Sequence, residues 1–73
     1  MADLYVWLVT EDDGREGPVA VVVPDMGNAA IPLVSANRTV IDGLGFFAKG
    51  HARATGKPVR LVRFAEAETL EKL

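Results

Sequence analysis

Two apolar runs, residues 4–9 and 18–23, lie on either side of a polar turn, residues 11–16, near the start of the chain. Asp13-Gly14 lies inside that stretch, and this dipeptide between apolar runs favours a two-residue type I′ turn. With these residues at the turn, Trp7 is expected opposite Ala20 and Leu8 opposite Val19. The pattern therefore predicts an N-terminal β-hairpin over residues 4–23.

Side chains alternate along a strand, so the predicted hairpin has two faces. We expect a helix to cover the aliphatic one: Leu4, Val6, Leu8, Val19, Val21 and Val23. The other face carries Tyr5, Trp7, Val9, Ala20 and Val22. It must be covered by a loop or C-terminal segment, or by a partner protein. Tyr and Trp combine an apolar body with a polar tip, which suits interfaces. Tyr5, Trp7, Val9 and Val22 are therefore candidate interface residues.

A turn-rich loop follows over residues 24–30, and residues 31–34 form a candidate short strand. Pro32 lacks an N–H group, which places such a strand at a sheet edge or at its first residue. The apolar loop between Pro24 and Pro32 could hold a small ligand, but a simple crossing of the sheet edge is the commoner role.

Residues from Ser35 or Asn37 to Thr55 are predicted to form a helix, ended by Gly56. Thr39 begins a second possible N-terminal signal, a capping box. Helical spacing places these side chains on a core-facing arc: Val40, Ile41, Leu44, Phe47, Ala48, His51 and Thr55. Gly43, Gly45 and Gly50 are expected on the flanks. Three glycines in a helix indicate a close approach to another element, or a break near residues 43–45.

Phe46 is predicted to point away from the core arc, between Lys49 and Arg53 on the opposite side of the helix. An exposed phenylalanine beside cations is a candidate contact for a partner protein. If the helix begins only after Gly45, this orientation no longer follows.

Residues 59–64 are predicted to form the last strand, with Arg60 and Arg63 on opposite faces, which is typical of a sheet edge. Residues 66–73 are predicted to form a short helix or a frayed end. The fold expected is a two-layer α+β domain of order ββαβα over residues 1–73. Its mostly antiparallel sheet has three or four strands, with the first strand central in the order 2-1-3.

Composition gives a broad class. The chain has 73 residues, 49% of them hydrophobic, and a mean hydropathy of +0.18, so a single small domain that gains from oligomerising is expected. The absence of cysteine favours a reducing cytoplasm. The sequence shows no signal peptide or apolar run long enough for a membrane span. Its alanine, valine and arginine content suggests a bacterial or phage gene.

Charge is polarised along the chain. Residues 35–64 carry six Lys or Arg against one acid, whereas the remainder carries two against nine. The two halves can pair within the fold or between copies. A basic surface could also bind nucleic acid, although the isoelectric point near 5.2 opposes that role. The candidate residues of this basic surface are Arg38, Lys49, Arg53, Arg60 and Arg63.

No catalytic, cofactor or metal motif is present. His51 is the sole histidine, and its place on the core arc predicts a packed, hydrogen-bonded side chain rather than a catalytic base. The function expected is therefore non-catalytic protein–protein interaction by a cytoplasmic homodimer, as an adaptor or inhibitor with a protein partner that the sequence does not identify. Nucleic-acid binding is the alternative.

Overall fold

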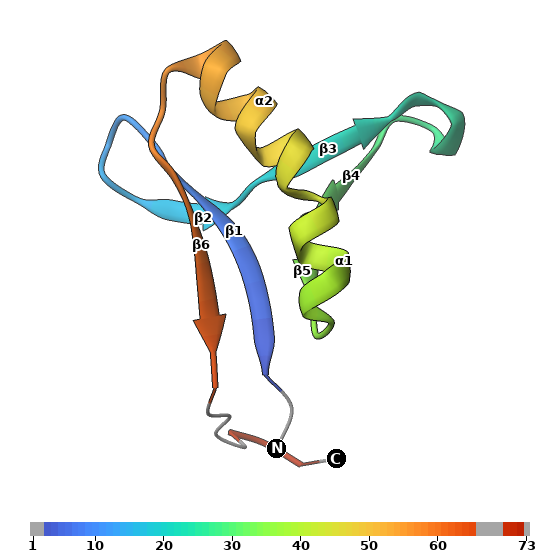
Figure 1. Cartoon of the computed structure of the whole chain (residues 1–73). Helices are drawn as coiled ribbons and strands as arrows, with labels where there is room; N and C mark the ends of the chain where they lie inside the picture. The colour runs from blue at the N-terminus through green and yellow to red at the C-terminus, as the bar shows by residue number, and fades with distance from the viewer. Residues whose placement is uncertain (1–2, 66–69, 73) are drawn as a thin grey trace.

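The computed structural model describes residues 3–65 and 70–72, and its main sheet is built around one central strand (Figure 1). In chain order the elements are β1 (Leu4–Thr10), β2 (Glu16–Pro18), β3 (Ala20–Val23), the 3₁₀ turn η1 (Pro24–Met26), β4 (Ala29–Pro32), β5 (Val34–Ser35), α1 (Arg38–Gly43), α2 (Gly45–Thr55) and β6 (Val59–Phe64). The α+β class is confirmed. The helix predicted over residues 66–73 falls mostly on residues 66–69 and 73, which lie outside the described residues.

The four strands of the main sheet are arranged with β1 antiparallel to each of its neighbours. β6 pairs along the whole of one side of β1. On the other side, β2 pairs with the second half of β1 and β5 with the first half. The central position of the first strand is thus as predicted. The last strand lies at a sheet edge, also as predicted, because β6 pairs with β1 alone among the described strands.

The register of the first hairpin differs from the prediction by one residue. Val9 is opposite Gly17, and Leu8 is opposite Pro18 instead of Val19. Gly14 alone adopts positive φ in this turn, at 85°, while its N–H donates to the Glu11 carbonyl at 2.9 Å. This is a turn followed by a left-handed residue, not a type I′ turn, which would need positive φ at two residues.

The register shift places Val19 on the face of β1 that carries Trp7 and Val9. A shift of one residue moves a whole set of side chains to the other face. Val19 joins Val9, Leu33 and Ala48 in the buried core, with Trp7 packed against this cluster. The helices therefore cover the aromatic face of β1, and the prediction that they cover the face of Leu4, Val6 and Leu8 is wrong.

Residues 19–23 also leave the main sheet instead of extending β2. Three backbone hydrogen bonds form a ring at the branch point: Val19 N–H donates to Trp7, Trp7 N–H to Leu33, and Leu33 N–H to Val19, at 2.8, 3.1 and 2.8 Å. Beyond this ring β3 pairs with β4. The two strands and their turn, residues 20–32, project from the body as an arm (Figure 1).

The helical segment begins and ends close to the predicted residues. The Asn37 side chain accepts hydrogen bonds from the N–H groups of Thr39 and Val40 at 2.8 and 3.2 Å, so Asn37 is the N-cap. Gly56 ends α2 in the left-handed conformation with φ of 70°. The segment is broken at Leu44, between the two glycines that suggested a break.

The buried side of the helical segment differs from the predicted core arc at three residues. Ile41 and Ala48 are fully buried, as predicted, but Val40 and Phe47 are 49% and 47% exposed, and Thr55 is exposed as well. The assignment of these three residues to the core arc was wrong. Gly45 is buried in their place, because a β-carbon there would lie 3.2 Å from Cζ2 of Trp7.

The Trp7 side chain also binds the helix break directly. Its indole Nε1–H donates to the Ile41 carbonyl at 2.9 Å. This carbonyl lies four residues before Gly45, where a continuous helix would use it for a backbone hydrogen bond. The indole thus provides a donor for a backbone acceptor at the break, and a buried acceptor without one is costly.

The two α2 glycines should respond to alanine in opposite directions. Gly45→Ala places a methyl group against the Trp7 ring, and the hydrogen bond from the indole to the Ile41 carbonyl holds that ring in place. We therefore expect a lower free energy of unfolding, although alanine has the better helix propensity. A β-carbon at Gly50 would have no neighbour within 4 Å, so Gly50→Ala should raise the free energy of unfolding by about 1 kcal/mol. Urea denaturation followed by circular dichroism measures both. A stabilised Gly45→Ala variant would contradict the close packing.

Trp7→Phe keeps an aromatic ring on β1 and removes the indole N–H. The Ile41 carbonyl then loses its donor, and we expect the free energy of unfolding to fall by about 1–3 kcal/mol. Circular dichroism in urea is the suitable measurement because the chain has no other tryptophan to report fluorescence. Unchanged stability would show that the hydrogen bond has no net effect.

Candidate functional site

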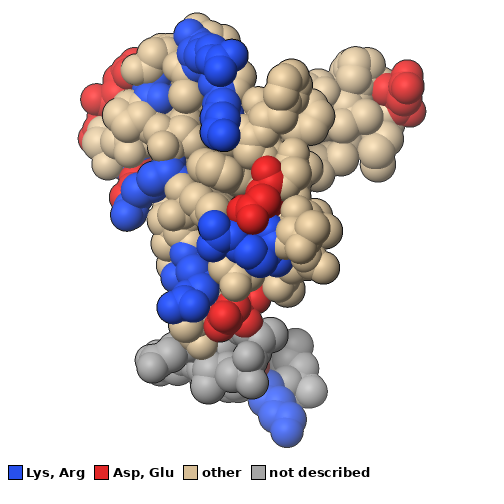
Figure 2. All heavy atoms as spheres, viewed as in Figure 1, with Lys and Arg blue, Asp and Glu red and all other residues tan. Residues whose placement is uncertain are grey.

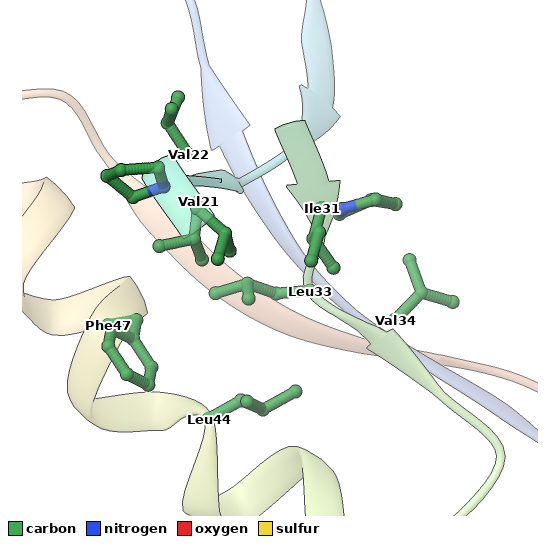
Figure 3. A pocket seen from close by; sticks show the side chains of 10 residues that line it. Val21, Val22, Ile31, Leu33, Val34, Leu44 and Phe47 are labelled. Atoms are coloured by element: carbon green, nitrogen blue, oxygen red, sulfur yellow. The ribbon is translucent and has the colours of Figure 1, made fainter. Parts of the chain in front are cut away.

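An open groove of about 420 Å³ lies between the arm and the helices (Figure 3). Phe47 and Leu44 approach it from the helical side, and Val21 of β3 and Ile31 of β4 lie opposite them. It is a groove and not a closed cavity, since Ile31 and Phe47 are 38% and 47% exposed. Every lining residue is aliphatic, aromatic or proline: Val21, Val22, Val23, Pro24, Ile31, Pro32, Leu33, Val34, Leu44 and Phe47.

The local sequence explains why the groove is apolar. Between Gly17 and Asn37 the only charged residue is Asp25, in the turn at the end of the arm. The space-filling view shows this arm as uncharged surface with one acidic group near its tip (Figure 2). A solvated hairpin normally carries charged or polar side chains on its exposed positions. The composition of the arm therefore differs from that of an ordinary solvated hairpin.

The predicted interface residues do not form one surface. Val9 is buried at 4% exposure, Trp7 packs against the core cluster, and Tyr5 lies beneath the Arg38 guanidinium, 5.6 Å from its ring centroid. Among the described residues, Val9 and Trp7 pack in the cluster that contains Ala48 of α2, and Tyr5 contacts Arg38 of α1. Val22 and Phe46 are exposed, at 58% and 79%.

Phe46 keeps its predicted exposed orientation although the helix is broken before it. Its ring packs edge-on against Phe47, with ring centroids 5.6 Å apart. Phe46 thus lies beside a groove residue without lining the groove itself.

The predicted basic surface is divided. Lys49 and Arg53 are exposed on α2, while Arg38 binds Asp42 at 2.8 Å. Arg60 is opposite Leu8 on β1, and Arg63 is opposite Tyr5, so these two arginines project from opposite faces of the sheet. Figure 2 shows the basic side chains spread over the length of the molecule, with acidic groups between them.

The acidic turn of the first hairpin pairs with basic residues near β6. Lys57 Nζ lies 2.5 Å from a Glu11 carboxylate oxygen. Arg60 donates two hydrogen bonds to the Glu16 carboxylate, at 2.8 and 2.9 Å. The prediction that oppositely charged parts pair within the fold is confirmed for these two contacts.

Both contacts shift pKa values. The hydrogen bonds from Arg60, aided by its positive charge, lower the pKa of Glu16 below its ordinary value of 4.5. The hydrogen bond to Glu11 and the nearby carboxylate charges raise the pKa of Lys57 above 10.5. These groups stabilise the join between the hairpin turn and β6.

His51 is partly buried, as predicted, but its buried Nε2 atom has no hydrogen-bond partner among the described residues. In the same part of the chain, no three His, Asp or Glu side chains lie close enough together to hold a metal ion. None of the helices described is both long enough and apolar enough to cross a membrane. The groove is therefore the site with the most distinctive geometry.

Sequence reasoning missed the contribution of Phe47 and Leu44 to this site because it placed both on the core arc. The available signal was the nearly uncharged stretch from Gly17 to Asn37, which is too long for a buried strand. The apolar loop between Pro24 and Pro32 was identified as a possible ligand site, and it does border the groove. Comparisons with protein-family models, with curated proteins and with solved structures find no match for this chain.

The Glu16–Arg60 contact predicts a pH-dependent stability. A carboxyl group whose pKa is lowered by folding stabilises the folded state above pH 4.5, and this contribution is lost as the pH falls through its folded-state pKa. Glu16→Gln should therefore lower the urea midpoint at neutral pH, and its difference from the wild type should shrink in acid. Asp25→Asn, which removes a carboxylate that makes no ion pair among the described residues, is the control. A difference that does not vary with pH would contradict the assignment.

Proposed function

We propose that this chain is a non-catalytic protein-binding module, whose groove between the arm and α2 accepts an apolar segment of another protein. The observation that supports it most directly is the wholly apolar lining of a groove whose outer wall is a nearly uncharged arm. Exposed apolar surfaces of this kind on small domains are typical of interaction sites.

The openness of the groove favours a peptide segment over an enclosed small molecule. Small-molecule sites combine apolar walls with a few polar groups that orient the ligand. No charged side chain lines this groove, so selectivity must come from the shape of inserted apolar side chains. The groove volume of about 420 Å³ fits a few Leu, Ile, Met or Phe side chains.

This function agrees with an adaptor or inhibitor role, in which binding alone produces the effect. The cytoplasmic location, the bacterial or phage origin and the homodimer expected from the sequence remain predictions. Nucleic-acid binding is the weaker candidate, because Arg60 and Arg38 are engaged by carboxylates and the five basic residues lie on different faces. We therefore do not propose it.

Selection from a phage-displayed library of random linear peptides tests the groove. We expect enriched peptides with spaced large apolar residues, and Phe47→Ser should weaken their binding at least about tenfold, as for a central contact residue. Val40→Ser is the matched control, because Val40 is 49% exposed, close to the 47% of Phe47, but does not line the groove. Fluorescence anisotropy of a labelled peptide gives the affinities.

Circular dichroism of both serine variants must show the wild-type fold for the comparison to hold. If no peptide is enriched, or if the enriched peptides bind the two variants equally well, the groove is not a peptide site.

A further inference from the structure

The arm has two outer edges, and their backbone groups can be assigned from the register. Leu33 N–H donates to the Val19 carbonyl, so residues 19 and 33 mark a hydrogen-bonded position of the ribbon. Hydrogen-bonded and non-hydrogen-bonded pairs alternate in an antiparallel ladder. The pairs Ala20–Pro32 and Val22–Ala30 are therefore non-hydrogen-bonded pairs. Their backbone N–H and C=O groups point outward, away from the other strand of the arm.

The two edges are not equally able to pair with another strand. On β4 the outward position 32 is proline, which has no N–H to donate and is a common protection of sheet edges. On β3 the outward residues are Ala20 and Val22, which together present two donors and two acceptors. No charged residue lies within β3, although charged side chains are the usual protection of an exposed edge.

The chain as a whole exposes more surface than a compact monomer of its mass. The accessible surface is 5640 Å², whereas a compact monomer of 7.8 kDa exposes about 4,400 Å². The radius of gyration of 13.6 Å likewise exceeds the value of about 11 Å for this length. The excess, about 1,240 Å², is larger than the roughly 800 Å² that each partner of a standard interface buries. An isolated two-stranded ribbon is also marginally stable.

We propose that two copies of this chain associate through the outer edge of β3, so that their arms form one four-stranded antiparallel sheet. A two-fold axis beside Val21 places Ala20 opposite the partner's Val22, and Val22 opposite the partner's Ala20. All four outward backbone groups of each β3 strand then find partners across the axis. The near absence of charge on the arm means that the two copies do not repel each other there.

This arrangement rests on the proposed function and deepens it, since it adds a second copy as a partner of the arm. The contact uses backbone groups of β3, whereas the proposed peptide site uses apolar side chains of the arm and the helices. A two-fold axis perpendicular to the shared sheet places both grooves on the same side of it. A dimer would thus bind one partner protein at two points, or two partners side by side.

Light scattering on a size-exclusion column, over a wide range of protein concentration, gives the mass. We expect twice the 7.8 kDa of one chain for the wild type. Val22→Lys should restore the single-chain mass by placing a charge at the β3 edge. Ala30→Lys is the matched control, because residues 22 and 30 are directly opposite each other but only residue 22 borders the second copy. It should remain a dimer.

Single cysteines test the register independently, since the chain has none of its own. Val21→Cys would lie on the two-fold axis in a non-hydrogen-bonded pair, where Cα atoms are about 4.5 Å apart and a disulfide can form. We expect rapid cross-linking on mild oxidation. Ile31→Cys, on β4 opposite residue 21, should cross-link far more slowly.

Three results would overturn this inference: a wild-type protein with the single-chain mass at every concentration, loss of the dimer in both lysine variants, or equal cross-linking of the two cysteine variants. None of them affects the peptide experiment, because a monomer retains its groove. Failure of the β3 contact and failure of the groove are therefore distinguishable.

Discussion

The contact between Trp7 and the helix break is the constraint on which the rest of this structure depends. The indole joins the central strand to the Ile41 carbonyl, and its ring occupies the space that a side chain at position 45 would need. The ring fixes the distance from sheet to helix, and the hydrogen bond fixes the position of the break. Because α2 begins at this break, Phe47 is turned toward the arm, and the groove exists.

The molecule divides its surface chemistry between two regions. In the body, carboxylates of the hairpin turn bind Lys57 and Arg60, so much of the charge there is already used within the fold. The arm has almost no charge and little packing beyond its base. Internal charge pairing in the body and an apolar arm together favour binding through burial of apolar surface, with little contribution from electrostatic attraction. Such binding should depend only weakly on salt concentration.

The sequence allowed much of the fold to be predicted, because several local signals point to one kind of structure. Gly56 marked the end of the helix, Asn37 was one of the candidate N-caps at its start, and the arginines of β6 indicated an edge strand. The arrangement of the faces was not predictable in the same way. Asp13-Gly14 can form more than one kind of turn, and the choice shifts the register by one residue, which moves the side chains of the second strand to the other face relative to those of β1. The departure of β3 from the sheet depends on pairing with Ile31 and its neighbours, a tertiary contact that strand propensity does not encode.

The hydrogen-bonded ring of Trp7, Val19 and Leu33 has a consequence for how such a protein can change over evolutionary time. At this ring β2 ends and β5 begins, both along the same side of β1. The arm is thus an insertion into what is otherwise one edge strand, with its two ends held together. Residues 20–32 can gain or lose pairs of residues without moving the body, since the ends of the insertion stay in place. The length of the arm, and with it one wall of the groove, can therefore change while the body keeps its structure.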